Sequence, residues 1–109
     1  MKISKELLKG STATMILKVI SEGDSYGYEI TQKIAARSKD VFKLNEGTLY
    51  PILHTMVKEK WVSAYDKESA TGRMRKYYTI TPLGQARLAL LLEEWRLFTV
   101  SVEGVLSEG

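Results

Sequence analysis

Apolar residues near the end of this 109-residue sequence recur at alternating intervals of three and four. That spacing is typical of a heptad seam on one long helix. A second apolar stripe, formed by Leu83, Leu90 and Leu97, lies beside it. The helix could pack back on the core of its own chain, but a domain of this size rarely needs so wide an apolar face. We therefore predict that the seam forms the interface of a homodimer. The seam residues are Leu88, Leu91, Trp95, Phe98, Val102 and Val105.

The sequence before this long helix predicts shorter helices and a β-hairpin. The first expected helix covers residues 11–24, where the apolar residues share one helical face. Ser25 is expected to cap a second helix over residues 26–39. Residues 61–81 alternate strand-forming residues around a polar turn, which predicts two paired strands. A threonine then caps the long helix, and Pro82 occupies its first position.

The third expected helix begins at Asn45 or Thr48 and ends near Trp61. Gly47 and Pro51 lie in its first turns, where a helix that serves only the core would have neither residue. If Thr48 is the cap, the proline falls in the first turn, where its missing N–H costs little. If Asn45 is the cap, the proline removes one backbone hydrogen bond, and the glycine eases the resulting clash.

Three helices followed by a hairpin is the order of a winged helix-turn-helix, whose third helix enters the major groove of DNA beside the wing. Leu49, Leu53, Met56 and Val57 are expected to be buried, which leaves the opposite face of this helix for the duplex. The fold class predicted is thus mainly α with a small β-hairpin wing and a long C-terminal dimerisation helix. The residues of the third helix predicted to contact DNA are Thr48, Tyr50, Pro51, His54 and Lys58.

The expected wing carries a cluster of positive charge. Residues 41–78 contain seven of the 16 Lys and Arg residues but only four of the 13 acidic ones. Arg73, Arg75 and Lys76 stand beside a glycine turn, and we predict that they contact phosphates or the minor groove. Solvated hairpin charge is the alternative interpretation. Lys43 is a weaker candidate of the same kind.

Several aromatic and polar residues have two interpretations. The Tyr50 hydroxyl is expected to donate to a phosphate, although its ring could instead cover the edge of the core. His54 is a DNA contact or a plain surface residue. Trp61 is expected in the core, and the tyrosines expected in the core or at a hinge are Tyr28, Tyr77 and Tyr78.

The composition argues against an enzyme and against a cofactor. The chain has no cysteine and one histidine, which excludes disulfides and thiolate sites and leaves a metal site unexpected. Phosphate-cradling glycine loops and nucleophile elbows are absent from the sequence. The first residues do not resemble a signal peptide, and apolar runs are too short to span a bilayer, so we expect a cytoplasmic protein. A winged helix that binds only proteins is the alternative function.

Three blocks of the sequence, "YGYEI" (residues 26–30), "EGTLYPIL" (46–53) and "GRMRKYYTITPLG" (72–84), resemble the PadR family of bacterial transcriptional regulators. They stand in that family's order and span nearly the whole chain. The resemblance implies a dimeric regulator with a winged helix-turn-helix in residues 1–81 and a dimerisation helix in residues 82–109, together one compact unit. It also implies double-stranded DNA as a partner, and a two-fold dimer predicts an inverted-repeat operator.

In some short members of that family, a tryptophan of the last helix flanks a flat aromatic ligand at the dimer centre. Trp95 matches that tryptophan. We therefore expect a homodimeric repressor that planar aromatic compounds release from its operator. The residues expected around the ligand are Trp95, Leu91, Phe98, Leu7 and Thr14.

Overall fold

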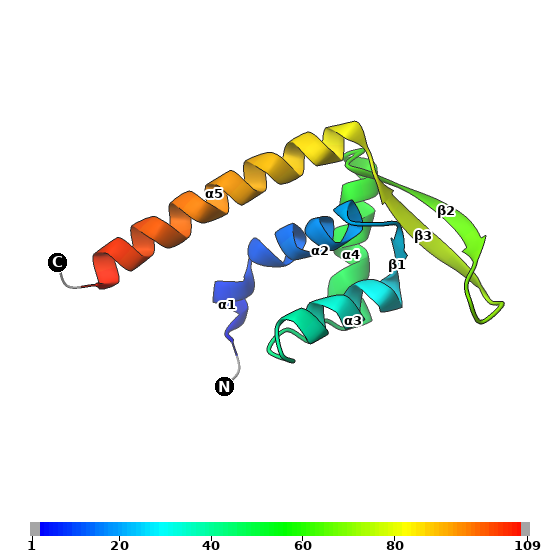
Figure 1. Cartoon of the computed structure of the whole chain (residues 1–109), viewed down its shortest axis with the longest axis horizontal. Coiled ribbons are helices and arrows are strands. Elements are labelled where there is room, and N and C mark those ends of the chain that lie inside the picture. The colour runs from blue at the N-terminus through cyan, green and yellow to red at the C-terminus, as the bar shows by residue number, and fades with distance from the viewer. Residues whose placement is uncertain (1–2, 108–109) are drawn as a thin grey trace.

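Five helices and one three-stranded antiparallel sheet make up residues 3–107, the part of the chain that the computed structural model describes (Figure 1). The strand order is β1-β3-β2, and β2 and β3 form the expected hairpin. The predicted mainly helical fold with a small wing is confirmed. The helices are α1 (Lys5–Leu8), α2 (Ser11–Ser21), α3 (Gly27–Arg37), α4 (Glu46–Lys58) and α5 (Pro82–Leu106), and the strands are β1 (Ser25–Tyr26), β2 (Val62–Glu68) and β3 (Met74–Ile80).

The start of α3 differs from the prediction. Ser25 does not cap this helix but lies in β1, where it pairs with Tyr78 of β3. Tyr26 precedes the helix, and the carboxylate of Glu29 accepts its backbone N–H at 3.2 Å. Glu29, in the first turn of α3, therefore satisfies the backbone N–H of the residue that precedes the helix, and Ser25 joins the sheet instead of capping.

A short helix, α1, precedes the first expected helix, which corresponds to α2. Gly10 has a φ of 88°, a left-handed conformation that glycine adopts readily, and it separates α1 from α2. Leu7 therefore lies on α1, and Thr14 lies on α2.

The hydrophobic core lies where α2, α3 and α4 meet the sheet and the first turns of α5. Val57 was expected here but is 39% exposed, because it falls one position beyond the face that Met56 defines. Trp61, which was expected in the core, is only partly buried and packs against the core. The core residues are Ile16, Leu17, Val19, Ile20, Ile30, Ile34, Leu49, Leu53, Met56, Val62, Tyr78 and Leu88.

The first turn of α5 is fixed to the turn that joins α4 to β2. Thr81 caps the helix as predicted: its hydroxyl accepts the N–H of Gly84 at 3.0 Å and donates to the carbonyl of Lys60 at 2.7 Å. A Cβ on Gly84 would lie 1.9 Å from the carbonyl oxygen of Trp61, so only glycine permits this approach. The "TPLG" segment therefore sets the direction in which α5 leaves the domain.

Beyond its first turns, α5 extends away from the body of the molecule (Figure 1). The helix has 25 residues, or about 37 Å at 1.5 Å per residue, and the molecule is 56 Å long in its longest dimension. Its N-terminal half packs on α2, where Leu88 is buried. Its C-terminal half exposes apolar side chains instead.

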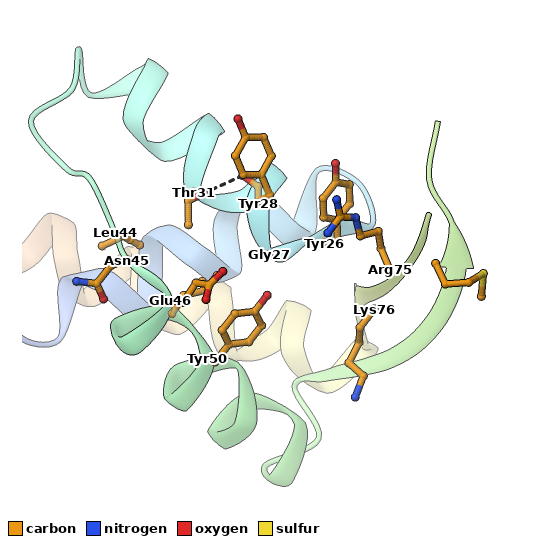
Figure 2. Close-up of a pocket in the computed structure, with 12 residues that line it drawn as sticks. Tyr26, Gly27, Tyr28, Thr31, Leu44, Asn45, Glu46, Tyr50, Arg75 and Lys76 are labelled. Atoms are coloured by element: carbon orange, nitrogen blue, oxygen red, sulfur yellow. Dashed lines mark hydrogen bonds between the residues drawn. The ribbon is translucent and has the colours of Figure 1, made fainter. Parts of the chain in front are cut away.

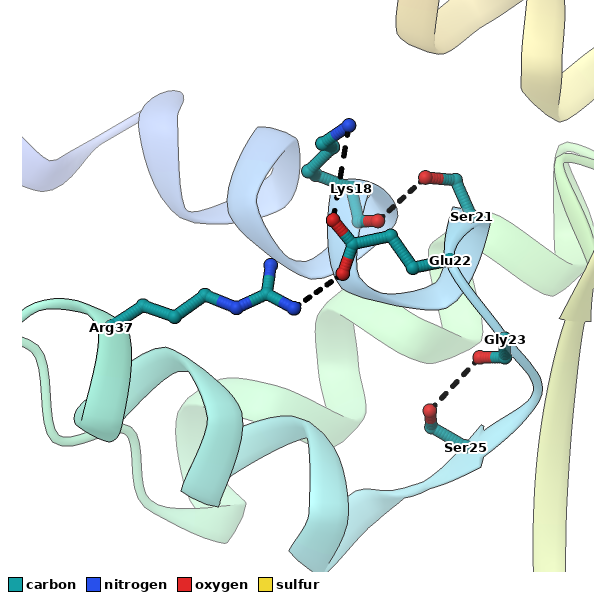
Figure 3. Close-up of polar contacts among 6 residues, drawn as sticks. All are labelled: Lys18, Ser21, Glu22, Gly23, Ser25 and Arg37. Atoms are coloured by element: carbon teal, nitrogen blue, oxygen red, sulfur yellow. Dashed lines mark hydrogen bonds and ion pairs between the residues drawn. The ribbon is translucent and has the colours of Figure 1, made fainter.

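An ion pair joins the ends of α2 and α3 (Figure 3). The Arg37 guanidinium donates to the carboxylate of Glu22, and Lys18 lies 3.8 Å from the same carboxylate. The hydrogen bond from Arg37 lowers the pKa of Glu22. These side chains are solvent-exposed, so we expect the ion pair to contribute little to stability.

Candidate nucleic-acid interface

The start of α4 resolves the choice between Asn45 and Thr48 as its cap. The Asn45 side-chain oxygen accepts the N–H of Thr48 at 2.9 Å, so Asn45 is the cap and α4 begins at Glu46. Pro51 is therefore inside the helix and removes the hydrogen bond that the carbonyl of Gly47 would otherwise accept. Both residues are exposed, so solvent is able to hydrogen-bond this carbonyl.

The face of α4 that points away from the core carries every residue predicted to contact DNA from this helix. Leu49, Leu53 and Met56 are at most 1% exposed and hold the opposite face in the core. The helix therefore presents a mixed surface of hydroxyl, ring and cationic groups. The exposed residues are Thr48, Tyr50, Pro51, His54 and Lys58.

Three tyrosines stack across the sheet at the base of the wing. Tyr77 of β3 contacts Tyr26 of β1 edge-on at 5.3 Å and stacks on Tyr65 of β2 at 5.9 Å, measured between ring centroids. The Arg75 guanidinium lies 5.2 Å from the centre of the Tyr26 ring, and the Lys67 ammonium lies 5.2 Å from the Tyr77 ring. We call these three rings the tyrosine ladder.

The three predicted cations of the wing differ in exposure. Arg73 and Lys76 are exposed, whereas Arg75 is partly buried by its contact with the ladder. The Nε of Arg75 is shielded from solvent and, among the described residues, has no hydrogen-bond partner. Arg75 is thus oriented by an aromatic ring, while Arg73 is free to adapt to a ligand.

A hydrogen bond from one residue of the ladder holds the wing to the loop between α2 and β1. The Tyr65 hydroxyl donates to the Asp24 carboxylate at 2.6 Å. This bond, followed by one from Thr79, lowers the pKa of Asp24 below its usual 3.8. The same bond to the carboxylate raises the pKa of Tyr65 above 10.0. The bond is therefore intact at neutral pH and restrains β2.

A cleft of about 550 Å³ separates α4 from the wing (Figure 2). Tyr50 points into it from α4, and Arg75 and Lys76 border it from β3. A Cβ on Gly27 would lie 2.5 Å from the Tyr50 hydroxyl, so the glycine of "YGYEI" makes room for this ring. The cleft is lined by Tyr26, Gly27, Tyr28, Thr31, Leu44, Asn45, Glu46, Leu49, Tyr50, Met74, Arg75 and Lys76.

This cleft brings together only some of the predicted DNA contacts and adds residues that the prediction missed. The predicted contacts outside its lining are Thr48, Pro51, His54, Lys58 and Arg73. Tyr28, expected in the core or at a hinge, is 63% exposed and borders it. Glu46 borders it too. The predicted burial of Tyr77 and Tyr78 is confirmed.

A second pocket, of about 460 Å³, lies between α1, α2 and α5. Trp95 and Phe98 border it with ring centroids 6.1 Å apart. All five residues expected around a ligand line this pocket: Leu7, Thr14, Leu91, Trp95 and Phe98. Phe42 and the charged side chains of Glu6, Lys9 and Glu94 line it as well.

Leu88, one of the six residues predicted to form the dimer interface, is buried within its own chain. Leu88 is 6% exposed and belongs to the core of its own chain, because the first turns of α5 cover α2. Leu91 is partly buried beside it, whereas Trp95, Phe98 and Val105 are 48%, 55% and 84% exposed. The heptad spacing thus joins a core segment and an open segment.

The family model of the transcriptional regulator PadR-like family matches residues 16–90. The chain belongs to the PadR-like family. The resemblance seen in the sequence is thereby confirmed. Regulators of the PadR family control transcription and bind DNA.

Individual relatives cover almost the whole of this PadR-like chain. It is 39% identical over 93 residues to a protein of Lysinibacillus sphaericus described as uncharacterized protein X, over 85% of each chain. A transcriptional regulator from Clostridium thermocellum has a TM-score of 0.86 at 31% identity and covers 94% of this chain and 100% of its own. A PadR-like transcriptional regulator from Bacillus cereus has a TM-score of 0.84 at 33% identity, over 96% and 100%.

Residues 3–107 of this PadR-like chain offer neither a metal site nor a membrane span. Groups of three or more acidic, histidine or cysteine side chains able to hold a metal ion are absent there. No helix in that range is both long and apolar enough to cross a membrane.

Proposed function

We propose that this PadR-like regulator binds an inverted-repeat operator as a homodimeric repressor, and that a planar aromatic compound releases it. The observation that carries the proposal is the cleft shared by α4 and β3, since it puts the exposed helix face and the basic wing side by side. A helix in the major groove with a wing beside it uses the two surfaces together. The winged helix-turn-helix of residues 1–81 would bind the duplex, and residues 82–109 would join the subunits. A repressor of this kind would act in the cytoplasm.

The homodimer is supported by the open segment of α5. Leu97, Phe98 and Val105 leave 70%, 55% and 84% of their surface exposed in the single chain. An exposed apolar surface of this extent on a helix is typical of a protein–protein interface. The proposed interface therefore consists of Leu91, Trp95, Phe98, Val102 and Val105, without Leu88.

Release by an aromatic ligand is supported by the pocket beside Trp95. Its lining combines two aromatic rings of α5 with aliphatic groups of α1, which suits a flat apolar compound. Because the rings stand on the proposed dimer helix, a ligand there would change how two subunits meet. A coupling of about 1–3 kcal/mol between ligand and operator would be sufficient for a switch.

DNA binding is tested by selecting genomic fragments on the wild-type protein and measuring their affinity across salt concentrations. Arg73→Ala should lower the slope of log affinity against log salt by about 1, because one phosphate contact is lost. Arg75→Ala should lower it similarly. Arg96→Ala is the matched control, since it removes the same charge from α5, away from the wing.

An unchanged slope in an Arg73→Ala/Arg75→Ala double variant would remove the wing from the interface. Variants at Tyr50 or His54 should instead alter which fragments are preferred. Absence of binding to every fragment at moderate salt would favour the other candidate, a winged helix that binds only proteins.

A further inference from the structure

A further, smaller pocket lies between α2, α4 and the turn that joins α4 to β2, and we call it the α4 pocket. Its volume is about 260 Å³, below the range of about 300–1,000 Å³ that is usual for small-molecule sites. The described residues that line it are all uncharged and mostly apolar, so the pocket suits aliphatic side chains rather than a soluble ligand. They are Ala13, Pro51, Ile52, Thr55, Met56 and Trp61.

The α4 pocket lies beside the apolar face of α5 that the proposed homodimer uses. The Arg87 guanidinium of α5 lies 5.0 Å from the centre of the Trp61 ring, at one edge of the pocket. Leu91 follows one helical turn later, and Phe98 and Val105 repeat its position at intervals of seven. The face of α5 that carries these residues therefore begins next to the α4 pocket.

The end of α5 is apolar and is not covered by its own chain. Val105 and Leu106 are 84% and 70% exposed. Phe98 is the middle residue of the five proposed for the interface, and Leu91 and Val105 lie seven positions before and after it. In a two-fold dimer whose helices run antiparallel about Phe98, Val105 of the partner subunit therefore lies opposite Leu91.

We propose that the end of α5 of the partner subunit docks in the α4 pocket, with Leu106 of the partner subunit between Ala13 and Trp61. The proposal rests on the homodimer proposed above. Ala13 is next to Thr14 in α2, and Thr14 lines the pocket of α1, α2 and α5 together with Leu91. The α4 pocket is therefore at the level along α5 where the helix of the partner subunit ends.

Leu106 lies on the correct side of the helix pair for this contact. It comes eighteen positions, or five helical turns, after the core residue Leu88, so both lie on the side of α5 that carries its own domain. An antiparallel pair has its two-fold axis perpendicular to the plane of the two helices, so both domains lie on the same side of that plane. Leu106 of each subunit therefore faces the domain of the other.

Docking in this pocket would connect the dimer interface to the helix proposed to read DNA. Four of the six lining residues belong to α4: Pro51, Ile52, Thr55 and Met56. A helix end seated there would fix the position of α4 relative to the α5 of the partner subunit. Trp95 precedes Leu106 by about three turns of the same helix, so a ligand that displaces α5 at Trp95 would withdraw this end from α4.

The chain contains no cysteine, so thiol cross-linking tests this contact without background. In a Thr55→Cys/Leu106→Cys variant, a short bis-maleimide should join two subunits into a species of doubled mass on a denaturing gel. A link within one chain would not double the mass, and α5 carries Leu106 away from the body that contains Thr55 (Figure 1). Thr55 and Leu106 are both exposed, so these substitutions should leave the fold intact, which circular dichroism verifies.

His54→Cys/Leu106→Cys is the matched control, because His54 is the neighbouring exposed residue of α4 and lies outside the pocket lining. It should remain a single-chain species. Sedimentation without DNA gives an independent measurement. Thr55→Asp should raise the dimer dissociation constant about tenfold or more, since docking would remove water from a carboxylate in an apolar pocket. His54→Asp introduces the same charge outside the pocket and should leave this constant unchanged.

The outcomes separate the docking site from the homodimer on which it rests. If the wild type is a dimer but the Thr55→Cys/Leu106→Cys variant cross-links no better than its control, the docking site is overturned and the homodimer stands. Equal dissociation constants for Thr55→Asp and His54→Asp would have the same meaning. A wild-type chain that sediments as a monomer at every concentration would remove the homodimer, and the docking site with it.

Discussion

The two ends of the molecule differ in how much of their surface the chain completes by itself. At the wing, Tyr65 is bonded to Asp24 and Arg75 lies on a tyrosine ring, so polar groups are held by their own chain. At the far end of α5, Leu97 and Val105 are 70% and 84% exposed. A polar surface whose side chains are already held in place suits a partner that binds reversibly. A large exposed apolar surface instead suits a permanent interface with another protein chain.

The same contrast occurs within α5. Leu88 and Phe98 belong to one heptad pattern, yet they are 6% and 55% exposed. The periodicity therefore identifies which side of a helix is apolar, but what covers that side changes along the helix. Variants at the two positions should separate folding from assembly.

The largest effect is expected from Leu88→Ala. Loss of a buried leucine side chain should lower the free energy of unfolding by about 2–5 kcal/mol. Leu90→Ala removes the same atoms from a position that is 60% exposed, and should cost less than about 1 kcal/mol. Urea denaturation at equal protein concentration measures both. Equal losses would mean that α5 is not divided into a core segment and an open segment.

Phe98→Asp should separate the subunits without unfolding them. A charge within an apolar interface is costly, and Phe98 touches little of its own chain's core. Sedimentation should show a monomer with unchanged helical content, and operator affinity should fall at least about tenfold because the half-sites are no longer linked. Val100→Asp, at an exposed position off the seam, is the matched control and should remain dimeric. A dimeric Phe98→Asp protein would refute the proposed interface.

Ligand binding would connect the two ends, and Trp95 should report it. With Trp61→Phe as background, planar dyes and phenolic compounds should quench Trp95 saturably and weaken operator binding about 5- to 150-fold. The quenching should disappear in Trp95→Ala. If no compound quenches Trp95 below millimolar concentration, the pocket is not a ligand site, and only the dimeric repressor remains proposed.

The sequence predicts those parts of the fold that local chemistry decides. The Thr81 cap, the hairpin and the buried face with Leu49 and Leu53 all follow from residues close in the chain. The role of Ser25 depends on an edge of β3, far along the chain, so a good capping residue was misassigned. Val57 was misplaced because it lies at the margin of an apolar face.

The candidate site was predicted less completely than the fold. The exposed face of α4 was predicted because its apolar residues recur at helical spacing and define the opposite, buried face. The cleft was missed because it forms only where three segments meet. The exposure of Tyr28 was not predicted, because tyrosine is intermediate in burial and the sequence alone does not decide whether it is covered. The second pocket was anticipated through the family resemblance, which supplied the long-range information that spacing lacks.

The smallest expected effect concerns the bond that braces the wing. Because folding lowers the pKa of Asp24, its stabilising contribution is present above 3.8 and is lost as pH falls through the folded-state value. Folding raises the pKa of Tyr65, so its contribution is present below 10.0 and is lost as pH rises through its own folded-state value. The difference in urea midpoint between the wild type and Tyr65→Phe should thus be constant from about pH 5 to pH 9 and shrink outside that window. In an Asp24→Asn background, Tyr65→Phe should change the urea midpoint by less than it does in the wild type. That change should not shrink in acid, since the amide of the asparagine does not titrate. If the difference in urea midpoint between the wild type and Tyr65→Phe is undiminished at about pH 2, a group other than the Asp24 carboxylate holds the Tyr65 hydroxyl.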